Sequence, residues 1–147
     1  VFFVGVGRVL LSLKAIAKRW AHLGIRTHIV GEITEPAITS KDILIVGSGS
    51  GESLIPVVIA KKAAELGARI VYIGSNTEST VAKLAALTVR IPVRTKLEKK
   101  DEIMSSQPMT SLFEQTLLLY GDAVAMMLIE SRNITLKDLW KQHANLE

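Results

Sequence analysis

The sequence contains no cysteine, and only 5% of its residues are aromatic. The lack of cysteine excludes disulfide bonds, thiolate metal sites and a cysteine nucleophile, and it fits a cytoplasmic protein. The three histidines are scattered and lack the spacing of a ligand set, so we expect no metal site. No apolar run approaches the ~18 residues of a membrane span, and no basic leader is visible. We therefore expect no membrane partner.

Dense basic stripes and phosphate-binding P-loops are absent as well. The formal net charge is only +4, and acidic residues interrupt the basic segment 94–100. Nucleic acid is therefore not an expected partner. The pair Gly5-Val6-Gly7 begins a dinucleotide fingerprint, but Leu10 stands where the third glycine is needed. We expect neither a nicotinamide nor a flavin, and no other cofactor.

Short apolar segments alternate with helical patterns along the chain. The predicted strands are 1–6, 26–30, 43–47, 69–73 and 88–91, and the predicted helices are 7–23, 54–66, 77–86, 111–130 and 135–142. Strands that are apolar on both faces and alternate with helices are typical of a parallel sheet covered on two sides. We therefore predict an α/β fold, a three-layer αβα sandwich with a five-stranded parallel sheet of order 2-1-3-4-5, as in flavodoxin-like proteins.

A glycine- and serine-rich turn follows the third predicted strand directly. This serine loop, residues 48–53, combines flexible glycines with three hydroxyls, and its only charged residue is Glu52. Because Pro56 is tolerated only in the first turn of a helix, the next helix should begin near Ser53 and leave the amides of residues 49–54 free. Such a loop suits an anion, most simply phosphate. The alternative is a plain flexible turn between a strand and a helix.

The predicted strand order places a second loop beside the serine loop. In the order 2-1-3-4-5 the chain reverses direction between strands 1 and 3, and ligands bind at the carboxyl ends of strands at such a point. Gly7 and Arg8 follow strand 1 there. Topology and motif thus predict one binding site.

Two titratable residues stand on apolar helical faces. Glu114 shares a face with Leu117 and Leu118, and His143 follows Trp140 at helical spacing. A buried carboxylate at a cleft is typical of a general base, whereas a structural arginine or serine partner is the alternative for Glu114. His143 is either a packing residue or a proton shuttle.

The segment 117–129 is apolar almost all round. A helix of this kind needs burial on more than one side. In a chain of this length the pattern indicates a subunit interface.

Several motifs together resemble the sugar isomerase (SIS) domain family, and within it the 6-phospho-3-hexuloisomerases. The loop Ser48-Gly49-Ser50-Gly51-Glu52-Ser53 marks the wider family. The narrower resemblance rests on two further segments: Gln107-Pro108-Met109-x-Ser111-Leu112-Phe113-Glu114-Gln115, and the ending His143-Ala144-Asn145-Leu146-Glu147.

This resemblance implies a cofactor-free isomerase that converts D-arabino-hex-3-ulose 6-phosphate to fructose 6-phosphate through an enediolate, in the ribulose monophosphate pathway. It implies Glu114 and His143 as the groups that move protons. The implied substrate-binding residues are Gly7, Arg8, Ser48, Gly49, Ser50, Glu52 and Ser53. The family's members are homodimers or homotetramers with active sites at subunit contacts, so the expected partners are a sugar phosphate and further copies of the chain.

Departures from the family pattern leave alternatives open. Val9 and Leu10 stand where members have Ser-Gly, which puts the exact sugar phosphate in question. An aldose–ketose isomerase, for example of arabinose 5-phosphate, or a non-catalytic phosphosugar-binding regulatory domain would share the same loop. We expect residues 1–147 to form one SIS domain, and we expect the helical segment that precedes strand 1 in members to be missing from this sequence.

Overall fold

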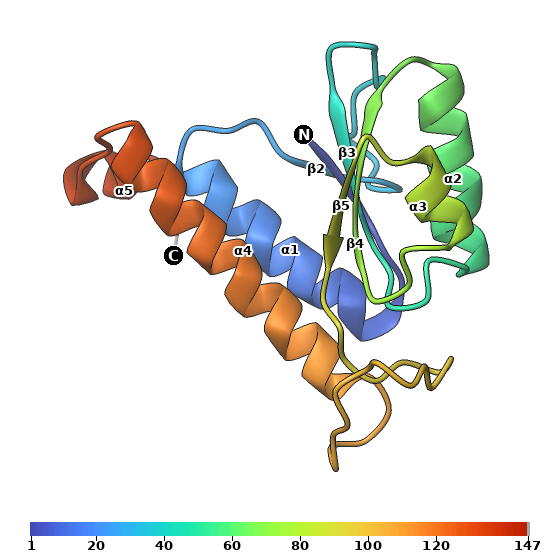
Figure 1. The fold of residues 1–147 in the computed structure, drawn as a ribbon. Coiled ribbons are helices and arrows are strands. Elements are labelled where there is room, and N and C mark those ends of the chain that lie inside the picture. Colours follow the sequence, from blue (N-terminus) through green and yellow to red (C-terminus); the bar gives the residue numbers. More distant parts are fainter. Residues whose placement is uncertain (147) are drawn as a thin grey trace.

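Within residues 1–146, which the computed structural model describes, five parallel strands form one sheet (Figure 1). Their order is β2-β1-β3-β4-β5, as predicted. All four strand pairings are parallel. The bounds are β1 Phe2–Val4, β2 His28–Ile29, β3 Ile43–Gly47, β4 Arg69–Gly74 and β5 Leu87–Arg90.

The helices cover both faces of the sheet, which confirms the three-layer sandwich. Helices α1 and α4 lie on one face, and α2 and α3 lie on the other (Figure 1). The small helix α5 lies at the far end of α4. The bounds are α1 Gly7–His22, α2 Leu54–Glu65, α3 Thr80–Leu84, α4 Ser111–Ser131 and α5 Leu136–Lys141.

The predicted ends of the elements agree with local chemistry. Gly24 and Gly67 follow α1 and α2 with φ of +76° and +80°, a backbone conformation that glycine adopts readily. Thr135 and Asp138 form the predicted capping box at the start of α5. The predicted helix at 77–86 is shorter in the structure, because Ser79 caps it and α3 begins at Thr80.

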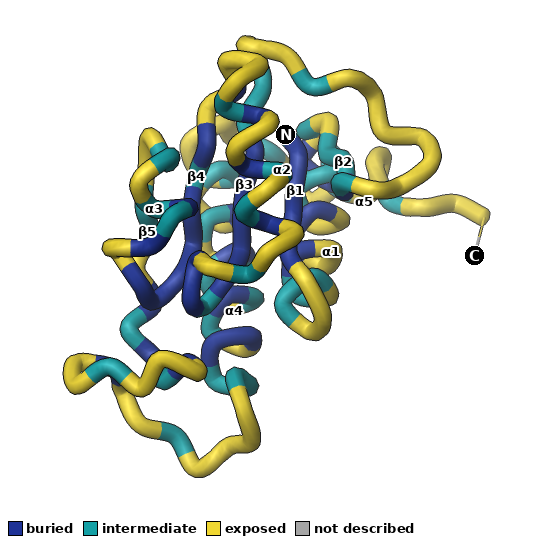
Figure 2. The backbone as a smooth tube through the Cα atoms, turned by 90° about the vertical axis from the view of Figure 1, so that its right-hand side faces the viewer, coloured by how far each residue is buried: buried dark blue, intermediate teal, exposed yellow. Residues whose placement is uncertain are grey.

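Two apolar clusters, one on each face of the sheet, hold the layers together. Figure 2 shows the buried course of the strands between them. Phe3, Leu13, Phe113 and Leu117 belong to the cluster under α1 and α4, and Tyr72 belongs to the cluster under α2 and α3. The strands are the buried centre of the molecule, whereas the segments before α4 and after β2 are largely exposed. The site is therefore built on rigid strand ends and on helix starts.

Helices α1 and α4 pack closely because one position between them has no side chain. A Cβ atom on Gly121 would lie 2.3 Å from Ile16 Cγ1, so only glycine fits there. The indole nitrogen of Trp20 also donates to the carbonyl of Gly121, at 3.3 Å. This contact fixes α4 along α1, and thereby fixes the position of the first turn of α4.

On length and composition, α4 is long and apolar enough to cross a membrane, which differs from the expectation based on apolar runs. However, the helix packs on the sheet and on α1 through Phe113, Leu117 and Ala125, which are buried. One face of the helix therefore belongs to the core, whereas Leu119, Met126 and Met127 are exposed.

Candidate active site

A cavity of about 650 Å³ opens at the carboxyl-terminal ends of the strands. Its walls come from the start of α1, the serine loop after β3, the loop that follows β5, and the start of α4. Six of the predicted site residues line it, together with the base candidate: Gly7, Arg8, Ser48, Gly49, Ser50, Ser53 and Glu114. The structure therefore brings the two predicted loops and the helix carboxylate to one place.

The serine loop is held partly by its own hydroxyls. The amide of Gly51 donates to Ser48 Oγ at 3.1 Å, and the amide of Glu52 donates to Ser50 Oγ at 3.3 Å. The prediction that all amides from 49 to 54 are free is therefore wrong for these two. Within residues 1–146, the amides of Gly49 and Ser50 donate no hydrogen bond to the protein. Ser48 Oγ also lies 3.4 Å from Ser53 Oγ, and either hydroxyl can be the donor of that bond. The Ser50 hydroxyl keeps its own proton for a ligand.

The end of β4 fixes the carbonyl oxygens of the serine loop. The Tyr72 hydroxyl donates to Ser48 O at 2.9 Å, the Ser75 amide donates to Gly49 O at 2.9 Å, and Asn76 Nδ2 donates to Ser50 O at 3.2 Å. In a trans peptide the N–H points opposite to the C=O. Carbonyls turned toward β4 therefore turn the next amides away from β4, toward the cavity. The backbone of the serine loop, the predicted anion cradle, is thus held in place by Tyr72, Ser75 and Asn76.

Tyr72 and Gly74 were missed by the sequence reasoning. Burial raises the pKa of Tyr72 to about 12, so its hydroxyl stays protonated and remains a donor. A Cβ atom on Gly74 would lie 2.0 Å from that hydroxyl, so glycine is needed for the contact. The pattern at 69–73 predicts only a buried strand, and nothing in it marks a tyrosine whose hydroxyl reaches another loop.

Glu114 lies in the first turn of α4 with its side chain 8% exposed. Its Oε2 accepts from Arg8 Nε at 2.5 Å, and its Oε1 accepts from Thr110 Oγ1 at 3.0 Å. Arg8 is 68% exposed, so the pair stands at the mouth of the cavity. The arginine partner fits the interpretation of Glu114 as a structural carboxylate. Its position on the cavity wall fits the interpretation of Glu114 as a general base.

Glu52 is not brought to the cavity. Its carboxylate accepts from the Thr80 amide at 2.7 Å and from the Thr80 hydroxyl at 2.9 Å. These two bonds hold the pKa of Glu52 below its usual value. The residue joins the end of the serine loop to the start of α3, and its side chain supports the loop from behind. Glu52 was predicted to bind the substrate, but in this structure it holds the serine loop to α3.

His143 is also away from the cavity. Its ring stacks on His22 with centroids 5.1 Å apart, and it lies as close to Trp140. His22 is in the last turn of α1, whereas Arg8 is in the first, so the two ends are about 20 Å apart. Within one chain, His143 and Glu114 therefore do not meet.

Thr95 and Lys96 line the cavity without having been predicted. Both residues belong to the stretch between the predicted strand 88–91 and the predicted helix 111–130, which is long enough for a functional loop but contains no motif. Val9 lines the cavity too, at the position where a serine was expected from the family pattern, and it makes that part of the wall apolar. Among residues 1–146 no group of three or more His, Asp or Glu side chains is arranged to hold a metal ion.

Comparisons with known proteins agree with this geometry. The SIS domain description matches residues 1–126. The 3-hexulose-6-phosphate isomerase of Bacillus subtilis is 41% identical over 147 residues, which is all of this chain and 80% of that protein. The enzyme of the same name from Mycobacterium gastri is 40% identical over all of this chain and 73% of its own length.

A solved structure is similar over nearly the whole chain. It is a hypothetical protein of Methanococcus jannaschii, for which the function of a 3-hexulose-6-phosphate isomerase was inferred. The two chains are 32% identical with a TM-score of 0.87, over 99% of this chain and 77% of the other. The sheet order is thus that of an established fold.

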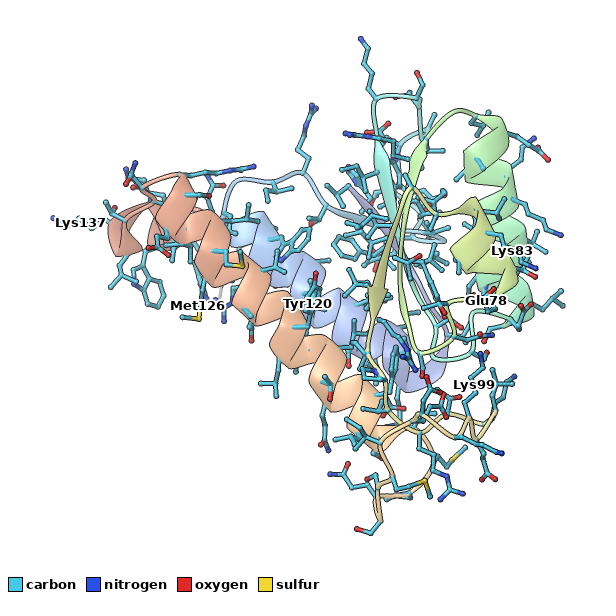
Figure 3. All side chains as sticks on the ribbon, viewed as in Figure 1. Glu78, Lys83, Lys99, Tyr120, Met126 and Lys137 are labelled. Atoms are coloured by element: carbon cyan, nitrogen blue, oxygen red, sulfur yellow. The ribbon has the colours of Figure 1, made fainter. Side chains whose placement is uncertain are left out.

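Replacing Tyr72 with phenylalanine tests the cradle. The change removes the hydroxyl that donates to Ser48 O and, at 3.4 Å, to Gly49 O. We therefore expect about 1 kcal/mol lower stability and severalfold weaker binding of inorganic phosphate. Thermal unfolding and calorimetric titration measure both. The matched control is Tyr120→Phe, because the Tyr120 hydroxyl (labelled in Figure 3) makes no hydrogen bond among residues 1–146. Unchanged phosphate affinity in Tyr72→Phe would contradict the preorganised cradle.

Proposed function

This chain belongs to the SIS domain family, and we propose that it interconverts D-arabino-hex-3-ulose 6-phosphate and fructose 6-phosphate. The family match covers residues 1–126, and we propose that the chain forms one SIS domain through to its end. We propose the cytoplasm as the place of this reaction, because its sugar phosphates are intermediates of central metabolism.

The observation that supports this proposal most directly is the shared cavity of Glu114 and the serine loop. The loop offers hydroxyls and amides for a phosphate, and Glu114 offers a buried carboxylate in the same space. An isomerase of sugar phosphates needs these two features: an anchor for the phosphate and a base near the reacting carbons. The identity of the proposed sugar substrate is taken from the names of the relatives.

In the proposed reaction the substrate phosphate sits in the serine loop. Glu114 removes the proton from C2 of the 3-ketose, and a 2,3-enediolate forms. The proton returns to C3, and the carbonyl moves from C3 to C2. Arg8, which is ion-paired with Glu114 and largely exposed, stands where it can stabilise the developing oxyanion when substrate displaces that pair.

A second proton-transfer group is proposed to come from another subunit. His143 is proposed as this group, and it lies at the end of the molecule opposite to Glu114. Helix α4 exposes large apolar side chains along its length, including Leu119, Met126 and Met127 (Met126 is labelled in Figure 3). A smaller hollow lies among Ala123, Met126, Met127, Ile129 and Glu130. These side chains favour contact with a second copy of the chain.

A twofold axis would bring opposite ends of the α4 helices of two copies together. In an isologous dimer with antiparallel α4 helices, the carboxyl end of one helix lies beside the amino end of its partner. One copy would then supply Glu114 and the phosphate cradle, and the other would supply His143. We therefore propose a homodimer, or a tetramer built from such dimers, as the active form.

Hydrogen exchange at the sugar carbons tests the reaction. The protein is incubated with fructose 6-phosphate in D₂O and followed by NMR. We expect deuterium at C3 and a new 3-ketose signal, because a 2,3-enediolate exchanges its proton with solvent. Deuterium at C1 would instead indicate an aldose–ketose isomerase. Binding without exchange would contradict the proposal and favour a regulatory phosphosugar-binding domain.

Glu114→Gln tests the base. We expect kcat to fall by about 10²–10⁴-fold, because the amide cannot take up a proton. Phosphate affinity should stay near that of the unchanged protein, since the cradle is built by other residues. Glu65→Gln, on the exposed surface of α2, is the matched control and should retain full activity. Near-normal kcat in Glu114→Gln would mean that another group is the base.

Mixing two inactive variants tests the proposed sharing of sites between subunits. Glu114→Gln and His143→Asn are each expected to lose most activity. Random exchange of subunits should restore about a quarter of the dimer sites, because one site of each mixed dimer then has both native residues. The assay is the isomerase rate after the subunits are dissociated and reassociated. No recovery in proven mixed dimers would show that His143 does not act across the interface.

A further inference from the structure

One buried carboxylate near the cavity has no part in the reaction as proposed. Glu102 is 5% exposed and lies between β5 and α4. It accepts four hydrogen bonds: from Ser75 Oγ at 2.7 Å, from Thr95 Oγ1 at 2.9 Å, from the Thr95 amide at 3.0 Å and from the Lys99 amide at 3.1 Å. Burial alone would raise the pKa of Glu102, but these bonds outweigh it and hold that pKa below the usual value.

These four bonds determine the shape of the loop 95–102. Apart from Glu102, the loop has mostly exposed and charged side chains and little apolar surface to bury. Ser75 follows β4, so the same carboxylate also joins the loop to the strand that fixes the cradle. Lys99, labelled in Figure 3, extends this connection, because its Nζ donates to Asn76 Oδ1. Asp101 is in turn ion-paired with Arg90 of β5, so the loop is attached to the sheet through the buried Glu102, through Lys99 and through this more exposed pair.

The attachment brings residue 96 beside the phosphate cradle. A Cβ atom on Gly49 would lie 3.0 Å from Thr95 Cγ2, so the Thr95 methyl packs on the backbone of the serine loop. Lys96 is the next residue, and it lines the cavity. The position of its charge relative to the cradle therefore depends on how firmly Thr95 is held.

Lys96 also fills a gap in the electrostatics of the site. The charged residues that line the cavity are Arg8, Lys96 and Glu114. Arg8 is paired with Glu114, whereas Lys96 makes no ion pair among residues 1–146. A phosphate held only by hydroxyls and amides would have no countercharge, and charge-assisted bonds are roughly twice as strong as neutral ones.

We propose that Lys96 is the cationic ligand of the substrate phosphate, and that Glu102 is a positioning residue that holds Lys96 there through Thr95. This inference rests on the proposed phosphate site of the serine loop. It does not depend on which sugar is isomerised.

Direct titration of the full chain with inorganic phosphate tests the ligand. We expect Lys96→Met to weaken phosphate binding about tenfold, and to raise KM for the sugar phosphate in parallel while kcat changes by less than about threefold. Lys96→Arg should restore most of the affinity. Lys100→Met, an exposed lysine of the same loop, is the matched control and should bind phosphate normally. Unchanged affinity in Lys96→Met would overturn the proposal.

A double-mutant cycle tests the role of Glu102. Glutamine keeps the shape of the side chain, but it turns an amide group toward donors, so Glu102→Gln should weaken phosphate binding about threefold to tenfold. The double variant with Lys96→Met should bind no worse than Lys96→Met alone, because both changes act on the same contact. Penalties that add would overturn the positioning role. Since phosphate binding requires no turnover, an inactive native protein would refute the isomerase function and leave this test intact.

Discussion

The hydrogen bonds from the end of β4 to the serine loop are the constraint on which the site depends. Tyr72, Ser75 and Asn76 occupy the carbonyl oxygens of three successive loop residues. Since each peptide unit is planar, the amides of Gly49 and Ser50 face away from β4, toward the cavity, whereas the amide of Gly51 donates to Ser48 Oγ. The cradle is therefore a property of two neighbouring strands in register, and the flexible glycines alone would not produce it.

The other wall of the site depends on helix packing. The absence of a side chain at Gly121 lets α4 lie close against α1, and the first turns of both helices then meet through Arg8 and Glu114. The base candidate is placed by helices and the phosphate cradle by strands. The distance between the base candidate and the cradle is thus determined by the way α1 and α4 pack on the sheet.

Much of this arrangement follows from sequence patterns, and the reason is physical. Apolar segments bounded by glycine define β3 and the serine loop, and their spacing defines the parallel sheet, so the cavity could be located from Gly7 to Ser53. Long-range contacts of single side chains have no such pattern. In the sequence, Tyr72 has the pattern of an ordinary core residue and Glu102 stands in a charged stretch. Glu52 was expected to bind the substrate, but its carboxylate binds Thr80.

The turns at Gly24 and Gly67 lie at the opposite edge of the sheet from the cavity. They join helices to the amino ends of strands, and none of their residues lines the cavity. Gly24 lies close to His22, on which the proposed proton-transfer residue His143 stacks, whereas the turn at Gly67 has only to close the chain. The turn at Gly67 is therefore the place where this scaffold can accept an inserted peptide, an affinity tag or a fused reporter while the pocket keeps its shape.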